Sequence, residues 1–95
     1  MSRRELVSAE TYAHVRRRDR EWTGDDCVGP YVGMPGACHY AIEVDHVRAS
    51  GGLGLRSRST PDNLVSLCRD HHRLKTEHGK TWRPALLAYL TLAEG

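Results

Sequence analysis

Two runs of the sequence decide how this chain folds: Glu43-Val-Asp-His-Val47 and Asp62-Asn-Leu-Val-Ser-Leu-Cys-Arg-Asp-His-His72. Residues 40–47 alternate, though imperfectly, between apolar and polar side chains, which predicts a β-strand. A turn at residues 61–63 precedes a second short apolar run at 64–67, and residues 69–76 predict a helix. We therefore expect a small α+β domain in which two strands lead into a helix.

Helices are expected on both sides of this core. Residues 8–20 predict a helix that Ser8 caps, with Glu10 in the first turn and arginines near the end. Pro84 is expected in the first turn of a last helix. The apolar stripe of that helix consists of Leu86, Leu87, Tyr89 and Leu90. Glycines and prolines make 23–37 a loop, and residues 50–60 predict a flexible basic loop.

The length of 95 residues predicts one domain, with a basic helical arm (1–22), a core (23–80) and a C-terminal helix (81–95). With no Phe and 39% apolar residues, such a core is near the limit of independent stability, and a bound metal is a common remedy. Three cysteines and no apolar run typical of a signal peptide predict an intracellular, cytoplasmic chain without a disulfide framework. No segment approaches the roughly eighteen apolar residues that span a membrane.

Charge is distributed unevenly along the chain. Residues 1–20 carry six arginines against three acids, and residues 48–83 carry eight basic against three acidic residues. Residues 21–47 between them hold five acids and no Lys or Arg. Two basic segments around an acidic middle suit phosphate binding on both sides of a metal site. A solvated basic face explains the same pattern when it is taken alone.

A zinc site is predicted by cysteine and histidine spacing. Cys68-x-x-His71 places two ligands at the end of a strand and in the first turn of a helix, where both can reach one ion. Cys27 and Cys38 complete a tetrahedral set, and zinc would tie the ends of the glycine-rich loop between them. His39 is an alternative fourth ligand. The alternative to any metal is that the cysteines are small buried apolar residues.

A second set of residues suits the hydrolysis of phosphodiesters, which needs an activated water and a cation on the phosphate. Asp45 is a hard ligand for a divalent cation, and His46 beside it can act as the base. Adjacent strand residues point to opposite faces, so these two share a site only if the strand breaks there. His72 is turned by about 100° from His71 on the helix, so it can face the strands. Asn63 can lock the preceding loop through hydrogen bonds to backbone groups. Alone, each residue has an ordinary structural explanation.

The order of these residues resembles the zinc-containing HNH endonucleases, especially their small phage-type members. The resemblance covers roughly residues 16–80 and rests on Glu43-Val-Asp-His-Val47, Ser50-Gly-Gly52, Asp62-Asn-Leu-Val-Ser-Leu-Cys68 and His71-His72-x-x-Lys75-Thr76. It implies a ββα-metal core in which Asp45 and His72 hold a catalytic Mg²⁺, Mn²⁺ or Ni²⁺. His46 would be the general base and Asn63 a structural residue. The implied zinc ligands are Cys27, Cys38, Cys68 and His71.

The chain departs from the family pattern in the long gap after Cys27 and in having His71 where a cysteine is commoner. Some members bind the catalytic metal with a further histidine, where this chain has Thr76. The resemblance therefore implies a two-residue site completed by water and phosphate, with His78 as an alternative ligand.

The expected activity is metal-dependent cleavage of DNA by a monomer or homodimer. Small phage-type members are associated with DNA packaging, so a phage terminase is an expected partner. The expected phosphate contacts are Arg16, Arg17, Arg56, Arg58, Arg73 and Lys75. Few aromatic residues lie among them, which predicts weak sequence preference. The alternative function is a catalytically inactive, zinc-stapled nucleic-acid-binding module, which would have no use for Asp45, His46 and His72 together.

Overall fold

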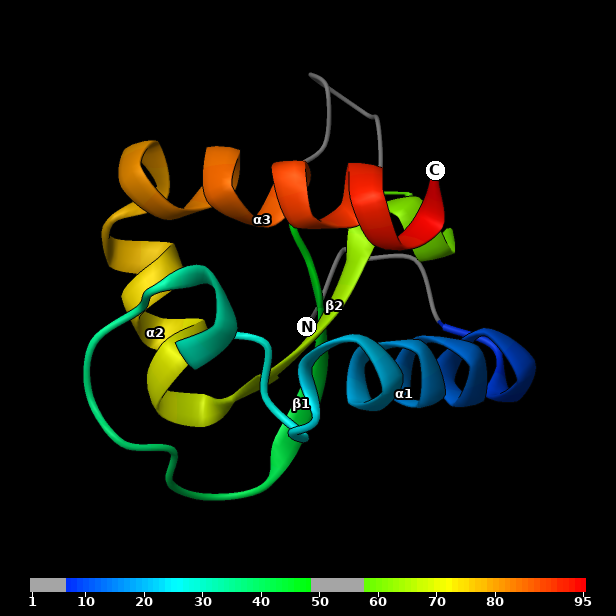
Figure 1. Ribbon diagram of the computed structural model, residues 1–95, viewed down its shortest axis with the longest axis horizontal. Helices are drawn as coiled ribbons and strands as arrows, with labels where there is room; N and C mark the ends of the chain where they lie inside the picture. The colour runs from blue at the N-terminus through cyan, green and yellow to red at the C-terminus, as the bar shows by residue number, and fades with distance from the viewer. Residues whose placement is uncertain (1–6, 49–57) are drawn as a thin grey trace, which may run out of the picture.

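The computed structural model describes residues 7–48 and 58–95 and has a small α+β fold (Figure 1). In chain order the elements are α1 (Ala9–Thr23), the 3₁₀ turn η1 (Pro30–Val32), β1 (Ile42–His46), the 3₁₀ turn η2 (Pro61–Asn63), β2 (Leu64–Cys68), α2 (Arg69–Glu77) and α3 (Gly79–Glu94). The α+β prediction is confirmed, and no described helix is long and apolar enough to cross a membrane.

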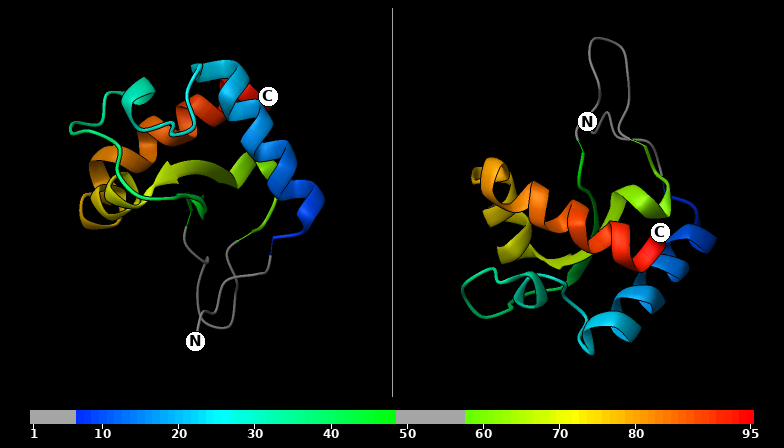
Figure 2. Two further views of the ribbon diagram at one scale, coloured as in Figure 1. Left: turned by 90° about the horizontal axis from the view of Figure 1, so that it is seen from below. Right: turned by 45° about the horizontal axis from the view of Figure 1, so that its top comes forward.

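The two strands form an antiparallel hairpin in which Ile42 lies opposite Cys68 and His46 opposite Leu64. All five residues of β2 are buried, whereas β1 is buried at Asp45 and His46. Figures 1 and 2 show the hairpin between α1 on one side and α2 on the other, with α3 packed across both helices. β2 runs directly into α2, so the end of the hairpin positions the first turn of that helix.

The first helix is capped as the sequence predicts. The Ser8 side chain accepts a hydrogen bond of 3.1 Å from the backbone N–H of Thr11, which satisfies a free donor of the first turn. Gly24 ends the helix with a φ of 73°, a left-handed conformation in which glycine is unstrained, and its N–H donates to Arg20 O. The helix therefore continues past the predicted end at residue 20.

The last helix begins earlier than predicted. It starts at Gly79, so Pro84 lies inside α3 and not in its first turn. His78 makes this early start possible because it joins the two helices directly. Its N–H donates to Leu74 O at the end of α2, and its carbonyl accepts from Thr81 and Trp82 at the start of α3. The predicted apolar stripe is confirmed at the buried Leu86, Tyr89 and Leu90, with Leu87 packed half-buried beside them.

A buried polar network ties α1 to β2 and α3. Asp19 is fully buried; its Oδ2 accepts from the Ser66 N–H of β2 at 2.8 Å and its Oδ1 from the Tyr89 hydroxyl at 2.5 Å. Arg18 donates to Asp19, to the carbonyl of Leu64 and to Glu94. Burial, reinforced by Asp19, raises the pKa of Tyr89 above its ordinary value. Part of the arginine run thus holds the fold together and is not available to a ligand.

Candidate metal centre and adjoining histidine cluster

Cys27, Cys38, Cys68 and His71 form a cluster whose ligand atoms all lie within 4.8 Å of one another. The His71 Nδ1 atom is 3.4 Å from Cys27 Sγ, 3.6 Å from Cys38 Sγ and 3.2 Å from Cys68 Sγ. Sulfur and nitrogen ligands of a tetrahedral zinc ion lie about 3.6 Å apart, so this cluster can hold a metal such as zinc. Among the described residues it is the one group of this kind.

Hydrogen bonds around the cluster fix its ligand atoms. The Nε2 atom of His71 is 3.0 Å from Pro35 O and 3.1 Å from Gly36 O. A carbonyl only accepts, so Nε2 carries the proton and Nδ1 presents its lone pair to the sulfurs. The backbone N–H groups of Gly29 and Cys68 donate to Cys27 Sγ, which favours the thiolate that a metal requires.

The pKa values of the thiols indicate what a bound metal would change in the cluster. Burial raises the pKa of Cys27, and it raises that of Cys38 to about 12 together with the contacts of Cys38 to the other two cysteines. Three thiolates in one cluster repel each other unless a positive charge lies among them. Binding of a divalent metal would supply this charge and release the thiol protons.

The alternative zinc ligand His39 lies elsewhere. Its Nδ1 atom is 2.8 Å from Asp70 Oδ2, and its side chain is 62% exposed. Cys38 beside it completes the cluster instead. The long segment after Cys27 is accommodated because η1 and the buried Met34 fold it over the cluster, where it delivers the carbonyls that bind His71.

His72, the neighbour of His71, faces the hairpin as predicted. Its Nε2 atom is 3.3 Å from Asp45 Oδ1, and its Nδ1 atom is 2.6 Å from Glu43 Oε1. The structure therefore brings Asp45 and His72 together, as the sequence predicts for this pair. Glu43 was missed as a site residue, although its position two residues before Asp45 on a strand places it on the same face.

Lys75 was predicted to contact phosphate, but the structure buries it. Its side chain is 6% exposed, and its ammonium group bonds Asp45 Oδ2 and the carbonyl of His46. The helix α2 turns Lys75 towards β1, one turn after His71 and His72, so its charge neutralises Asp45 inside the protein. Asp45 therefore meets Lys75 with one oxygen and His72 with the other.

The strand does not break between Asp45 and His46, so the break that would turn their side chains towards one site is not found. Both belong to the ladder of β1, with Asp45 opposite Val65 and His46 opposite Leu64. Asp45 faces α2, whereas His46 Nε2 lies 2.9 Å from Ser59 Oγ. Strand alternation thus directs the two side chains to different neighbours. The strand ends at His46.

Asn63 locks the chain as predicted. Its Oδ1 accepts from the Arg48 N–H at 2.8 Å, and its Nδ2 donates to Arg58 O at 2.9 Å. Its own carbonyl accepts from the Val47 N–H at 2.9 Å. One buried amide therefore joins the chain after β1 to the chain before η2.

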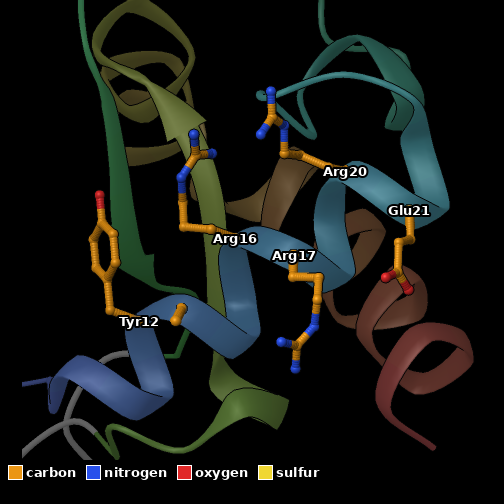
Figure 3. Close-up of a pocket in the computed structure, with 6 residues that line it drawn as sticks. Tyr12, Arg16, Arg17, Arg20 and Glu21 are labelled. Carbon is orange, nitrogen blue, oxygen red and sulfur yellow. The ribbon is translucent and has the colours of Figure 1, made fainter.

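The residues predicted to contact phosphate differ in how exposed their side chains are. Arg17, Arg58 and Arg73 are exposed, whereas Arg16 bonds the backbone carbonyl and the side chain of Asp26. Arg56 lies outside the described residues. A surface cleft of about 620 Å³ follows α1 and is lined by Tyr12, Ala13, Arg16, Arg17, Arg20 and Glu21. Figure 3 shows Tyr12, Arg16 and Arg20 along one side of α1, with Arg17 pointing away from them.

No known protein family, curated protein or solved structure matches this chain in comparisons of its sequence and fold.

Proposed function

We propose that the protein is a metal-dependent HNH endonuclease that hydrolyses DNA phosphodiester bonds, with a ββα-metal core formed by β1, β2 and α2. The observation that carries the proposal is the approach of His72 Nε2 to Asp45 Oδ1, 3.3 Å apart, beside His46 at the end of β1. This contact brings together Asp45 and His72, which are far apart in the sequence, and such a nuclease would need a cation there and a base nearby.

The residues divide the chemistry between them. Asp45 and His72 would hold a Mg²⁺, Mn²⁺ or Ni²⁺ ion, which supplies positive charge to the scissile phosphate and the leaving oxygen. His46 takes the proton of the attacking water as general base. Because the side chains of Asp45 and His46 diverge along the unbroken strand, this proposal requires the phosphate to lie at the end of β1, where the strand stops. Asn63 holds the chain on either side of this point.

DNA would be held through its phosphates. The exposed Arg17, Arg58 and Arg73 and the cleft along α1 offer guanidinium groups without a base-reading helix. This supports binding with weak sequence preference and a steep dependence on salt. A role in phage DNA packaging beside a terminase belongs to this proposal and rests on the resemblance alone.

Plasmid cleavage tests the activity. Supercoiled DNA is incubated with the zinc-loaded protein and Mg²⁺, Mn²⁺ or Ni²⁺, and nicked and linear products are measured. We expect His46→Ala to lose at least about 100-fold in rate, since a general base contributes roughly that much or more. His39→Ala, which changes an exposed histidine outside the site, should cut like the wild type. An intact plasmid with every metal, or full activity of His46→Ala, would refute the proposal.

The second candidate is an inactive, zinc-stapled nucleic-acid-binding module. It is favoured by Lys75, which already neutralises Asp45, because a structural ion pair needs no catalytic metal. This candidate predicts salt-dependent DNA binding without cleavage. A fluorescence anisotropy titration of labelled duplex, run beside the plasmid assay, separates the two.

A further inference from the structure

Glu43 and Asp45 flank the ring of His72 from β1. Glu43 Oε1 lies 2.6 Å from Nδ1, and Asp45 Oδ1 lies 3.3 Å from Nε2. Both partners are carboxylates, which accept hydrogen bonds and cannot donate them when ionised. A neutral imidazole has one N–H group, so it can serve only one of the two oxygens.

The shorter contact decides which nitrogen keeps the proton. With the proton on Nδ1, directed at Glu43, the Nε2 lone pair faces Asp45 Oδ1. Two electron-rich atoms 3.3 Å apart repel each other, and a divalent cation bound to both removes that repulsion. Lys75 bonds Oδ2 of Asp45, and Oδ1 is the oxygen that faces His72, so the cation would bind at Oδ1.

We propose, on the basis of the nuclease function above, that Glu43 is a positioning residue that holds the His72 proton on Nδ1 and so makes Nε2 the ligand of the catalytic cation. The neighbouring zinc cluster follows the same rule with the ring nitrogens exchanged. There, the carbonyls of Pro35 and Gly36 hold the proton of His71 on Nε2, and Nδ1 faces the sulfurs.

Metal affinity tests this role without DNA. Zinc-loaded protein is titrated with Mn²⁺ by calorimetry, and we expect Glu43→Ala to raise the Kd about 10–100-fold, the usual effect of losing the hydrogen-bond partner of a metal-binding histidine. Glu43→Gln should stay near the wild type because its amide oxygen can accept the same hydrogen bond. Asp70→Ala is the matched control: Asp70 is 42% exposed against 41% for Glu43, but it pairs with His39.

The tautomer of His72 gives a second readout that a merely structural role would not change. In ¹⁵N NMR spectra at a pH where imidazole is neutral, we expect the Nδ1–H form in the wild type and in Glu43→Gln. Glu43→Ala should shift towards the Nε2–H form, which predominates in free histidine.

An Nε2–H form in the wild type, a wild type that binds no Mn²⁺, or an unchanged Kd in Glu43→Ala would each overturn the role of Glu43. An equal loss in Asp70→Ala would do so too, because the effect would not be specific. The nuclease proposal fails separately: a wild type that cuts no plasmid, while Glu43→Ala still weakens Mn²⁺ binding, would refute the activity and leave the role of Glu43 intact.

Discussion

Gly29 lies against the ring of His71, where a β-carbon would be 2.7 Å from Cγ and 2.9 Å from Nδ1. The backbone here is right-handed, so close approach and not a special φ requires glycine. We expect Gly29→Ala to push the His71 ring out of the cluster at a cost of about 1–3 kcal/mol. Zinc affinity, measured by competition with a chromophoric chelator, should fall accordingly, by about 5–150-fold.

Gly79→Ala provides the matched control for this change. The atoms that its β-carbon would meet belong to the tip of the flexible Arg83 side chain, which can move aside. Because Gly79 begins α3, alanine there should leave zinc affinity unchanged and stabilise the helix by about 0.5–1 kcal/mol. Equal zinc affinity in wild type and Gly29→Ala would contradict the close packing of Gly29 on His71.

At the scale of elements, the hydrogen bond from Tyr89 of α3 to Asp19 of α1 should make the stability of the fold depend on pH. Burial and Asp19 raise the pKa of Tyr89 above its ordinary 10.0, so the folded protein holds this proton more tightly than the unfolded chain. The contribution of Tyr89 to stability is therefore complete below about pH 10 and is lost as the pH rises beyond it. Denaturant unfolding across this range measures the loss.

Tyr89→Phe should remove that alkaline loss. At neutral pH the variant should unfold with about 1.5–3 kcal/mol less free energy, since Asp19 loses a hydrogen bond to a buried charge. Above pH 10 its deficit should shrink. The two proteins share every other side chain, so the difference between them isolates Tyr89. The exposed Tyr12, changed to Phe, is the control, and a deficit in Tyr89→Phe that is constant with pH would refute this pH dependence.

Local patterns predicted most elements but not the way one helix follows another. The apolar runs predicted both strands, although all five residues of β2 are buried and β1 is buried only at Asp45 and His46. Ser8 marked the start of α1 through its hydrogen bond. Pro84 misled because proline commonly begins a helix, whereas here His78 alone separates α3 from α2. Nothing in the local sequence reports that two helices share a capping residue.

The candidate site was predictable only where ligand spacing carries the information. The cluster of three cysteines and His71 follows from Cys68-x-x-His71 and the remaining cysteines. Glu43 was accessible from strand alternation with Asp45. The burial of Lys75 was not, because it depends on how α2 packs against β1. The local sequence around Lys75 would be the same whether its side chain were exposed or buried in an ion pair.

For the whole molecule, we expect the role of the cysteine cluster in stability to be separable from the role in cleavage proposed for His72. Cys68→Ala removes a ligand at the junction of β2 and α2, so this small core should unfold or melt far lower than the wild type. His72→Ala should melt near the wild type but leave plasmid DNA intact. Thermal melts with and without a zinc chelator, beside elemental analysis expected near one zinc per chain, check this.

Removing and restoring zinc provides the control for these separate roles. A chelator should lower the melting temperature of His72→Ala as much as that of the wild type, and added zinc should restore both. Neither the chelator nor added zinc should change the melting temperature of Cys68→Ala. If Cys68→Ala and His72→Ala melted alike, the two neighbouring clusters would not have the separate roles described above.

The clasp formed by Asn63 has a consequence for protein engineering. The side-chain amide of Asn63 bonds the backbone of both Arg48 and Arg58. These two positions are therefore held together whatever residues lie between them. Lengthening a stretch whose ends are held costs little, about 0.6 kcal/mol for each doubling. We therefore expect a longer segment inserted between residues 48 and 58 to cost little stability and to leave the register of the hairpin, with His46 opposite Leu64, unchanged.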